Sequence, residues 1–124
     1  MKYILAIIVL LIVNVSYAEN LVIVDNLDVA KHEAKETNST LVVVFSAEWC
    51  KYCTILKSDI ENNPNDLKNH VICIIDYDSQ RDLVDSFNVK TIPDSIILDP
   101  IENKIVKRKR GYSNFTDYKK WLGL

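Results

Sequence analysis

Short continuous runs of apolar residues recur along the chain after residue 20, and each run is typical of a strand. The runs occupy residues 21–24, 41–45, 71–76, 95–98 and 105–106. The run at 41–45 consists largely of β-branched residues, which favours a strand that helices cover on both faces. Asp99 and Pro100 begin the segment between the last two runs, so we expect a turn and a hairpin there.

Between these runs the apolar residues recur at helical spacing, which predicts helices over residues 27–37, 50–62, 81–87 and 114–122. The predicted buried faces are Leu27, Ala30 and Ala34 in the first helix, Cys53, Leu56 and Ile60 in the second, Leu83, Val84 and Phe87 in the third, and Phe115, Tyr118, Trp121 and Leu122 in the last. Ser113 is the N-cap that we expect for the last helix. The order β-α-β-α-β-α-β-β-α predicts an α/β fold. Its mixed central sheet has a parallel core, an antiparallel C-terminal hairpin and helices on both faces.

The first 18 residues differ from the rest of the chain. Lys2 is followed by an uninterrupted apolar run over residues 4–13, and small residues follow at Ser16 and Ala18. This combination predicts a secretory signal peptide that is cleaved after Ala18. An uncleaved anchor is the alternative, but a membrane-spanning helix needs roughly 20 apolar residues, and this run is shorter. We therefore expect residues 1–18 to be a signal peptide, residues 19–124 to form one domain, and the protein to be exported, periplasmic or secreted.

Composition narrows the possible partners and the role of the cysteines. The net charge of −2 over 124 residues gives no reason to expect nucleic acid or a membrane surface as partner. A domain of about 100 residues buries a sizeable core without disulfides. Three cysteines are too few for a disulfide scaffold in an exported protein, so we expect their role to be chemical.

Cys50 and Cys53 lie where a predicted buried strand gives way to a predicted helix. The C-x-x-C spacing puts both sulfurs on the first helical turn, where the helix presents free N–H groups and the positive end of its dipole. Both features favour a thiolate at Cys50, and cysteines at helix N-termini commonly have lowered pKa values. Thiol–disulfide exchange needs an exposed attacking sulfur and a resolving sulfur beside it, and this pair supplies both.

The same cysteines could instead bind a metal or haem, or form a structural bond. A zinc site would require two more ligands, and the sequence has no second C-x-x-C or H-x-x-x-H; we expect His32 and His70 to be surface residues and no metal to bind. Thr54 follows the pair, so the C-x-x-C-H haem attachment pattern is absent. A purely structural disulfide is still an alternative, although so short a loop constrains the unfolded chain little. Cys73 lies within an apolar run, where a free cysteine behaves as a small hydrophobic residue; a third redox cysteine is the alternative.

At this point the sequence resembles thioredoxin. Residues 43–53, Val-Val-Phe-Ser-Ala-Glu-Trp-Cys-Lys-Tyr-Cys, resemble the family's strand and active-site turn. Thr91, Ile92 and Pro93 resemble its cis-proline loop, and Gly111 falls where the family has a glycine after the last strand. The resemblance covers essentially residues 21–124 and implies the thioredoxin fold.

The resemblance also implies roles for individual residues. Cys50 would be the nucleophile and Cys53 the resolving cysteine, and no cofactor beyond their redox-active disulfide is expected. The Ile92–Pro93 bond would be cis, and the Ile92 backbone would pair with an extended substrate segment beside the sulfurs. Trp49 would cover one side of the site and contact substrate; a core position is the alternative for this side chain.

Several residues depart from the family pattern. Lys51 and Tyr52 stand between the cysteines in place of Gly-Pro, and we expect them to modulate the site, Lys51 through its positive charge. Val44 and Ile72 stand where the family has a buried aspartate and a buried lysine, so the usual proton acceptor for the resolving cysteine is missing. Asp94 follows the proline and is expected to put a negative charge close to where substrate docks.

The sequence therefore predicts a monomeric thiol–disulfide oxidoreductase that acts on protein disulfides and dithiols outside the cytoplasm. Reduction is favoured over oxidation because the site looks most like those of reducing members, and a reductase there would need a membrane electron donor. A non-enzymatic binding module with an inert disulfide, and a disulfide oxidase or isomerase, are the alternatives. The basic run at residues 107–110 is interpreted as a charged edge strand, and a docking patch for an acidic partner is the alternative.

Overall fold

The structure is a computed structural model that describes residues 20–124, so the predicted signal peptide lies outside the described residues. The strands within this range are β1 (Val22–Val24), β2 (Thr40–Ser46), β3 (His70–Asp76), β4 (Asp94–Leu98) and β5 (Ile105–Arg110). The helices are α1 (Leu27–Thr37), α2 (Lys51–Asn62), α3 (Arg81–Ser86) and α4 (Phe115–Leu122). The predicted element order is confirmed.

The five strands form one mixed sheet in the order β1-β3-β2-β4-β5. Both β1 and β2 run parallel to β3, whereas β4 runs antiparallel to β2 and to β5. The parallel core and the antiparallel C-terminal hairpin are as predicted. Because β2 and β3 are parallel neighbours, their carboxyl ends lie together at the same end of the sheet, and the segment that carries the cysteines begins there.

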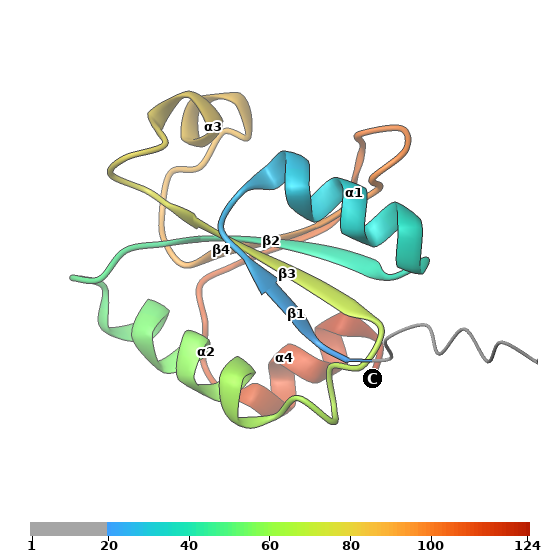
Figure 1. The fold of residues 1–124 in the computed structure, drawn as a ribbon. Coiled ribbons are helices and arrows are strands. Elements are labelled where there is room, and N and C mark those ends of the chain that lie inside the picture. The colour runs from blue at the N-terminus through green and yellow to red at the C-terminus, as the bar shows by residue number, and fades with distance from the viewer. Residues whose placement is uncertain (1–19) are drawn as a thin grey trace, which may run out of the picture.

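Helices cover both faces of the sheet, with α1 and α3 on one side and α2 and α4 on the other (Figure 1). The alternating side chains of β2 serve both layers: Leu41, Val43 and Phe45 pack under α1 and α3, and Val42 and Val44 pack under α2 and α4. All five are buried, which confirms the strand covered on both faces that the β-branched run predicts.

The predicted helix faces point into these two cores. The fully buried members are Leu27, Ala30 and Ala34 of α1, Cys53, Leu56 and Ile60 of α2, Val84 of α3, and Tyr118 of α4. The remaining members are half-buried and pack against the core edges: Leu83, Phe87, Phe115, Trp121 and Leu122. No helix between residues 20 and 124 is both long and apolar enough to cross a membrane.

Three expectations need correction. His70, the first residue of β3, is buried and not at the surface, and its Nδ1 lies 2.8 Å from the Lys68 carbonyl oxygen. The N-cap of α4 is Asn114 and not Ser113, since the Asn114 side chain accepts the Asp117 N–H at 2.9 Å. Finally, β5 continues through the basic run to Arg110, where pairing with β4 and not apolar content holds the strand. As predicted, this strand lies at an edge of the sheet.

Candidate active site

Cys50 is the N-cap residue of α2. Its backbone is still extended, and its Sγ accepts the backbone N–H of Cys53 at 3.3 Å. Its carbonyl oxygen meanwhile accepts the first helical hydrogen bond, from the Thr54 N–H at 3.1 Å. The cysteine sulfur thus replaces the side-chain oxygen of a common N-cap, and a free helix N–H points directly at it. A negative charge on that sulfur would be stabilised by this N–H and by the helix dipole.

Cys50 and Cys53 form a disulfide, with their Cα atoms 5.2 Å apart. The two residues differ in exposure: Cys50 is half-buried, whereas Cys53 is only 1 % exposed. An incoming disulfide can therefore reach Cys50 and not Cys53. The difference follows from the helix, because Cys53 lies one turn further in, on the same buried face as Leu56 and Ile60.

The segment before β4 packs against the disulfide. The carbonyl oxygen of Ile92 lies 3.8 Å from the Cys50 Sγ, and the Ile92–Pro93 peptide bond is cis. The Pro93 carbonyl oxygen accepts the Gly111 N–H at 2.7 Å, which ties this loop to the end of β5. Gly111 has a φ of +85°, a conformation that glycine adopts without steric cost. The fold thus brings together residues that lie some 40 positions apart in the sequence.

Trp49 lies on the solvent side of the site and is 67 % exposed. Its indole Nε1 donates a hydrogen bond to Asp78 Oδ2 at 2.7 Å. Lys51 and Tyr52, on the first turn of α2, are also exposed. Sequence reasoning missed Asp78. Its signal was its place just after β3, because the ends of neighbouring parallel strands lie together.

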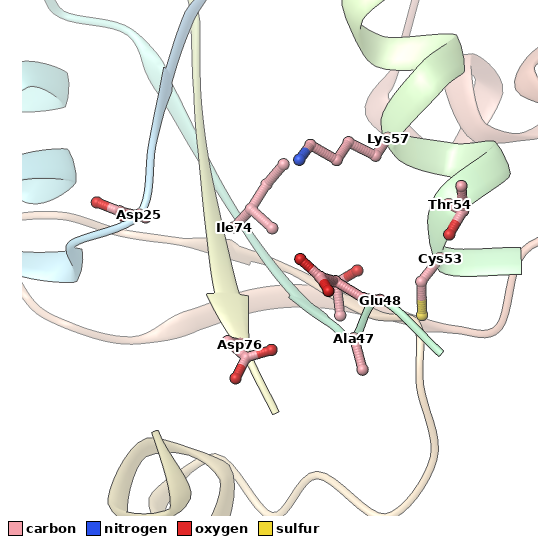
Figure 2. A pocket seen from close by; sticks show the side chains of 9 residues that line it. Asp25, Ala47, Glu48, Cys53, Thr54, Lys57, Ile74 and Asp76 are labelled. Carbon is pink, nitrogen blue, oxygen red and sulfur yellow. The ribbon is translucent and has the colours of Figure 1, made fainter. Parts of the chain in front are cut away.

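An open cleft of about 570 Å³ lies beside Cys53 (Figure 2). Its lining combines the resolving cysteine with charged side chains of several elements: Asp25, Ser46, Ala47, Glu48, Cys53, Thr54, Lys57, Ile74 and Asp76. Figure 2 shows the Lys57 chain reaching from α2 toward Ile74, with the Glu48 carboxylate between them and Asp76. The polar groups near Cys53 therefore line a cleft that is open to water.

The interior beneath the cysteines is apolar. Val44 is 2 % exposed and Ile72 is fully buried, and both belong to the core that includes Leu56. Because valine and isoleucine occupy these two positions, this part of the core holds no carboxylate there. Cys53 is itself among the residues that line the polar cleft.

Asp94 corrects a further expectation. Its side chain is fully buried and pairs with Arg108, whose Nη2 lies 2.6 Å from Asp94 Oδ2. The charge is therefore matched inside the protein and is not presented to a docking substrate. Because of this contact, Arg108 of the basic run is largely covered and is not an exposed charge of the edge strand.

Cys73 is a free thiol on β3 and is buried among the residues under α1 and α3, which confirms its predicted core position. Burial, assisted by the negative charge of Asp25, raises the pKa of Cys73 to about 12. Within the described residues no cluster of His, Cys, Asp and Glu side chains has the arrangement of a metal site.

We expect Cys73 to resist alkylation in the folded, reduced protein. At pH 8 a thiol with a pKa of about 12 is ionised in about one molecule in ten thousand, and the thiolate is the reactive form. Peptide mapping after iodoacetamide treatment should find Cys50 modified and Cys73 unmodified until denaturant is added. Equal labelling of the two residues in the folded protein would contradict this prediction.

Comparison with known proteins agrees with this geometry. The family described as "Thioredoxin-like domain" matches residues 27–124. Thioredoxin H2 of Arabidopsis thaliana is 31% identical over 67 residues, which cover 54% of this chain and 50% of the relative. A thioredoxin of Mycoplasmoides gallisepticum is 27% identical over 86 residues, which cover 69% of this chain and 84% of the relative. The crystal structure of thioredoxin NaTrxh from Nicotiana alata superposes with a TM-score of 0.66 at 24% identity, covering 83% of this chain and 90% of that one.

The mixed sheet between two helical layers, with a disulfide at the N-terminus of α2, defines a thioredoxin-fold protein with a C-x-x-C site. The chain belongs to the thioredoxin-like family. It spans half the length of the Arabidopsis relative. In general terms, the family and the cysteine pair support thiol–disulfide exchange as the chemistry of this site.

Proposed function

We propose that this protein reduces disulfides in other proteins by exchange through Cys50 and Cys53. The observation that carries the proposal is the difference between the two sulfurs. One is half-buried and accepts a helix N–H, beside a backbone carbonyl 3.8 Å away, and the other is buried within bonding reach. An inert disulfide would need neither the accessible sulfur nor the N–H directed at it.

The proposed reaction conserves atoms and electrons. In the reduced protein the Cys50 thiolate attacks one sulfur of the substrate disulfide, which forms a mixed disulfide and releases a substrate thiolate. Cys53 then loses its proton, attacks the Cys50 sulfur, and releases the second substrate thiolate. Each released thiolate takes up a proton from solvent. Two electrons pass to the substrate, and the protein is left with the Cys50–Cys53 disulfide.

The residues around the cysteines take supporting roles in this proposal. The backbone of Ile92, beside the Cys50 sulfur, would pair with an extended substrate segment, and Trp49 with Tyr52 would offer exposed aromatic surface next to it. The cleft beside Cys53 would let water carry away the proton of the resolving thiol. Lys51 would add positive charge near the reactive sulfur.

The proposal also includes a direction of exchange, namely that the protein reduces its substrates. Resemblance to thioredoxins favours reduction, and potentials in this fold family run from about −270 mV for thioredoxin to about −120 mV for a strong oxidant. Equilibration with glutathione buffers, with the disulfide content read by mass spectrometry, would measure the potential. We expect a value near the reducing end. A value near −120 mV would replace the reductase by an oxidase.

We further propose that the protein works outside the cytoplasm, as the N-terminal 18 residues suggest, and that it acts as a monomer there. A reductase in such a compartment needs a supply of electrons, so a membrane-bound dithiol donor would have to reduce its disulfide after each turnover. Fractionation of the expressing host, with detection of the chain that begins at Glu19, tests the first statement. Detection of the full-length chain only in the cytoplasm would refute it.

Replacing Trp49 by alanine is expected to weaken protein reduction while leaving the fold intact. Exposed aromatic residues beside a reactive centre contribute much of the contact with a protein substrate, so kcat/KM for insulin should fall about tenfold, equivalent to about 1.4 kcal/mol. The free energy of unfolding should change by less than about 0.5 kcal/mol, because the side chain is 67 % exposed. Ile101→Ala, which changes another exposed apolar residue, in the β4–β5 turn, is the control and should alter neither quantity. Equal losses in both variants would contradict a substrate-contacting role.

A further inference from the structure

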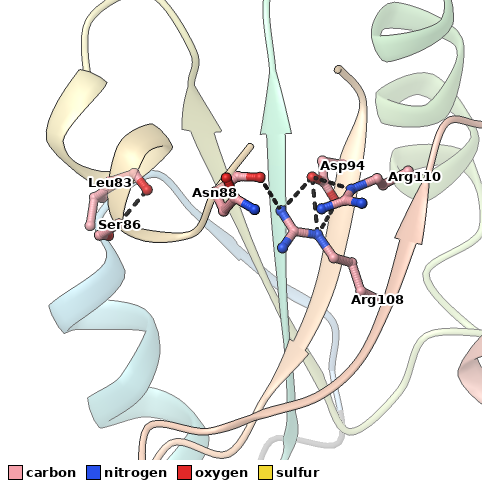
Figure 3. Close-up of polar contacts among 6 residues, drawn as sticks. All are labelled: Leu83, Ser86, Asn88, Asp94, Arg108 and Arg110. Carbon is pink, nitrogen blue, oxygen red and sulfur yellow. Dashed lines mark hydrogen bonds and ion pairs between the residues drawn. The ribbon is translucent and has the colours of Figure 1, made fainter. Parts of the chain in front are cut away.

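A buried carboxylate stands immediately after the cis proline. Asp94 is the first residue of β4 and is fully buried. The guanidinium of Arg108 binds it with a fork: Nε donates to Oδ1 at 3.0 Å and to Oδ2 at 3.1 Å, and Nη2 donates to Oδ2 at 2.6 Å (Figure 3). Arg108 is itself largely covered, with a side chain only 19 % exposed. Such planar two-oxygen recognition fixes geometry as well as charge.

The pair joins three separate segments. Besides Asp94, the Arg108 Nη2 donates to the carbonyl oxygen of Asn88, in the turn after α3, at 3.3 Å. Arg110 approaches from the same face of β5, but its Nε is 3.8 Å from Asp94 Oδ2 and its side chain is 50 % exposed. One arginine therefore connects β5, the start of β4 and the turn after α3, whereas the other only adds charge nearby.

These contacts surround the loop that touches the active-site sulfur. Asp94 lies two residues after the carbonyl that is 3.8 Å from Cys50 Sγ. Between them, the Pro93 carbonyl oxygen accepts the Gly111 N–H at 2.7 Å, also from the end of β5. Asn88 lies four residues before Ile92, so Arg108 holds the chain on both sides of the loop.

Stability alone is a weak reason for a buried ion pair. Removing two charges from water costs about what their attraction returns, and a well-packed apolar pair of similar volume is often as stable. A bidentate arginine–carboxylate contact adds geometric specificity, because both planar groups must keep their relative orientation. Here the carboxylate belongs to the backbone segment beside the nucleophile.

We propose that Asp94 and Arg108 are positioning residues that hold the Ile92 backbone in place for pairing with an extended protein substrate. The inference rests on the proposed function, because it concerns how a protein substrate docks. It separates two classes of substrate: a protein disulfide, which uses the backbone of the loop, and a small disulfide, which reaches Cys50 without it. A looser loop should therefore weaken the reduction of a protein disulfide and leave the reduction of a small disulfide unchanged.

The test compares Arg108→Lys with Arg110→Gln. Lysine keeps the charge that Asp94 needs but cannot form the fork or also reach Asn88. In insulin reduction driven by dithiothreitol, we expect the KM of Arg108→Lys to rise about tenfold with kcat within about twofold of the wild type. Its rate constant with hydroxyethyl disulfide should stay within about twofold of the wild type, because a small disulfide needs no docking. Arg110→Gln, on the same strand and also near Asp94, should match the wild type in every measurement.

A second measurement does not depend on activity. The Gly111 N–H is bonded to the loop, so its hydrogen exchange reports how firmly the loop is held. It should become faster in Arg108→Lys and stay unchanged in Arg110→Gln, with both variants folded by circular dichroism.

Failure of this inference is distinguishable from failure of the proposed function. Wild-type protein that leaves insulin oxidised overturns the function, and the Gly111 exchange still decides the role of the pair. Unchanged exchange and unchanged KM in Arg108→Lys would overturn the positioning role. Equal losses with insulin and with hydroxyethyl disulfide would do the same, because the effect would then lie in the cysteines themselves.

Discussion

Replacing Cys50 by serine is expected to lower the rate of insulin reduction at least about a thousandfold, because a hydroxyl at neutral pH cannot replace the thiolate as nucleophile. Cys53→Ser should also stop turnover, but with a different product. Its Cys50 sulfur still attacks, and with no resolving thiol the mixed disulfide persists. Non-reducing electrophoresis and mass spectrometry should therefore find Cys53→Ser covalently bound to its substrate and Cys50→Ser free.

The third cysteine provides the matched control for this experiment. Cys73→Ala removes a sulfur that is buried on β3 and whose pKa is raised to about 12. The variant should keep the insulin activity of the wild type at temperatures where it is folded. Full activity in Cys50→Ser would refute the exchange mechanism. Trapping by Cys50→Ser and not by Cys53→Ser would reverse the two roles.

Introducing an aspartate at Val44 is expected to cost about 3–5 kcal/mol of unfolding free energy at neutral pH, because it buries a charge without a partner. Val44 is 2 % exposed in the core under α2 and α4. Burial raises the pKa of such a carboxyl above its value in the unfolded chain. The cost should therefore be small below the unfolded-state pKa, grow as the pH rises toward the folded-state pKa, and stay constant above it. Urea unfolding of the oxidised protein between pH 4 and pH 8 would measure this dependence.

The same variant tests how Cys53 loses its proton. A carboxylate at Val44 would lie under the cysteines, so the step that resolves the mixed disulfide should become faster and gain a new pH dependence. Val42→Asp is the control. It lies two residues earlier on the same face of β2 and is equally buried, but it is further from the active-site end of the strand. It should lose stability in the same way without changing the resolving step. An identical kinetic change in both variants would show that the effect comes from destabilisation.

The helix over residues 27–37 and the second helix show why local patterns predict so much of this fold. In both, apolar residues recur with the period of one helical face, and the ends carry capping residues: Asn26 accepts the Val29 N–H at 3.0 Å, and Cys50 caps α2. The helical period depends only on neighbours within a turn, so it can be predicted from the sequence, whereas the exact capping residue is less certain from local pattern, as the cap of α4 at Asn114 in place of Ser113 shows. The basic end of β5 has no such pattern, and its strand exists because β4 lies beside it.

The candidate site divides in the same way. The cysteine pair and the Thr-Ile-Pro segment could be identified from residue types at fixed spacing. Asp78, which accepts the hydrogen bond of the Trp49 indole, and the charged cleft beside Cys53 have no such spacing pattern, because each depends on which strand ends meet. The position of Asp78 just after a strand is the one indication that the sequence offers for it. His70 shows that residue type alone does not predict burial: its side chain is polar, yet the start of β3 is covered and the residue is buried.

Local patterns along the chain specify the order of strands and helices, the faces that they bury, the reactive sulfur pair and the family resemblance. These follow from periodicity and from spacing within a few residues. Two contacts arise only in the folded chain: Asp94 pairs with Arg108, 14 residues away, and Ile92 lies against Cys50, 42 residues away. Such contacts depend on strand register and on burial, which the whole fold sets and no local stretch of sequence encodes.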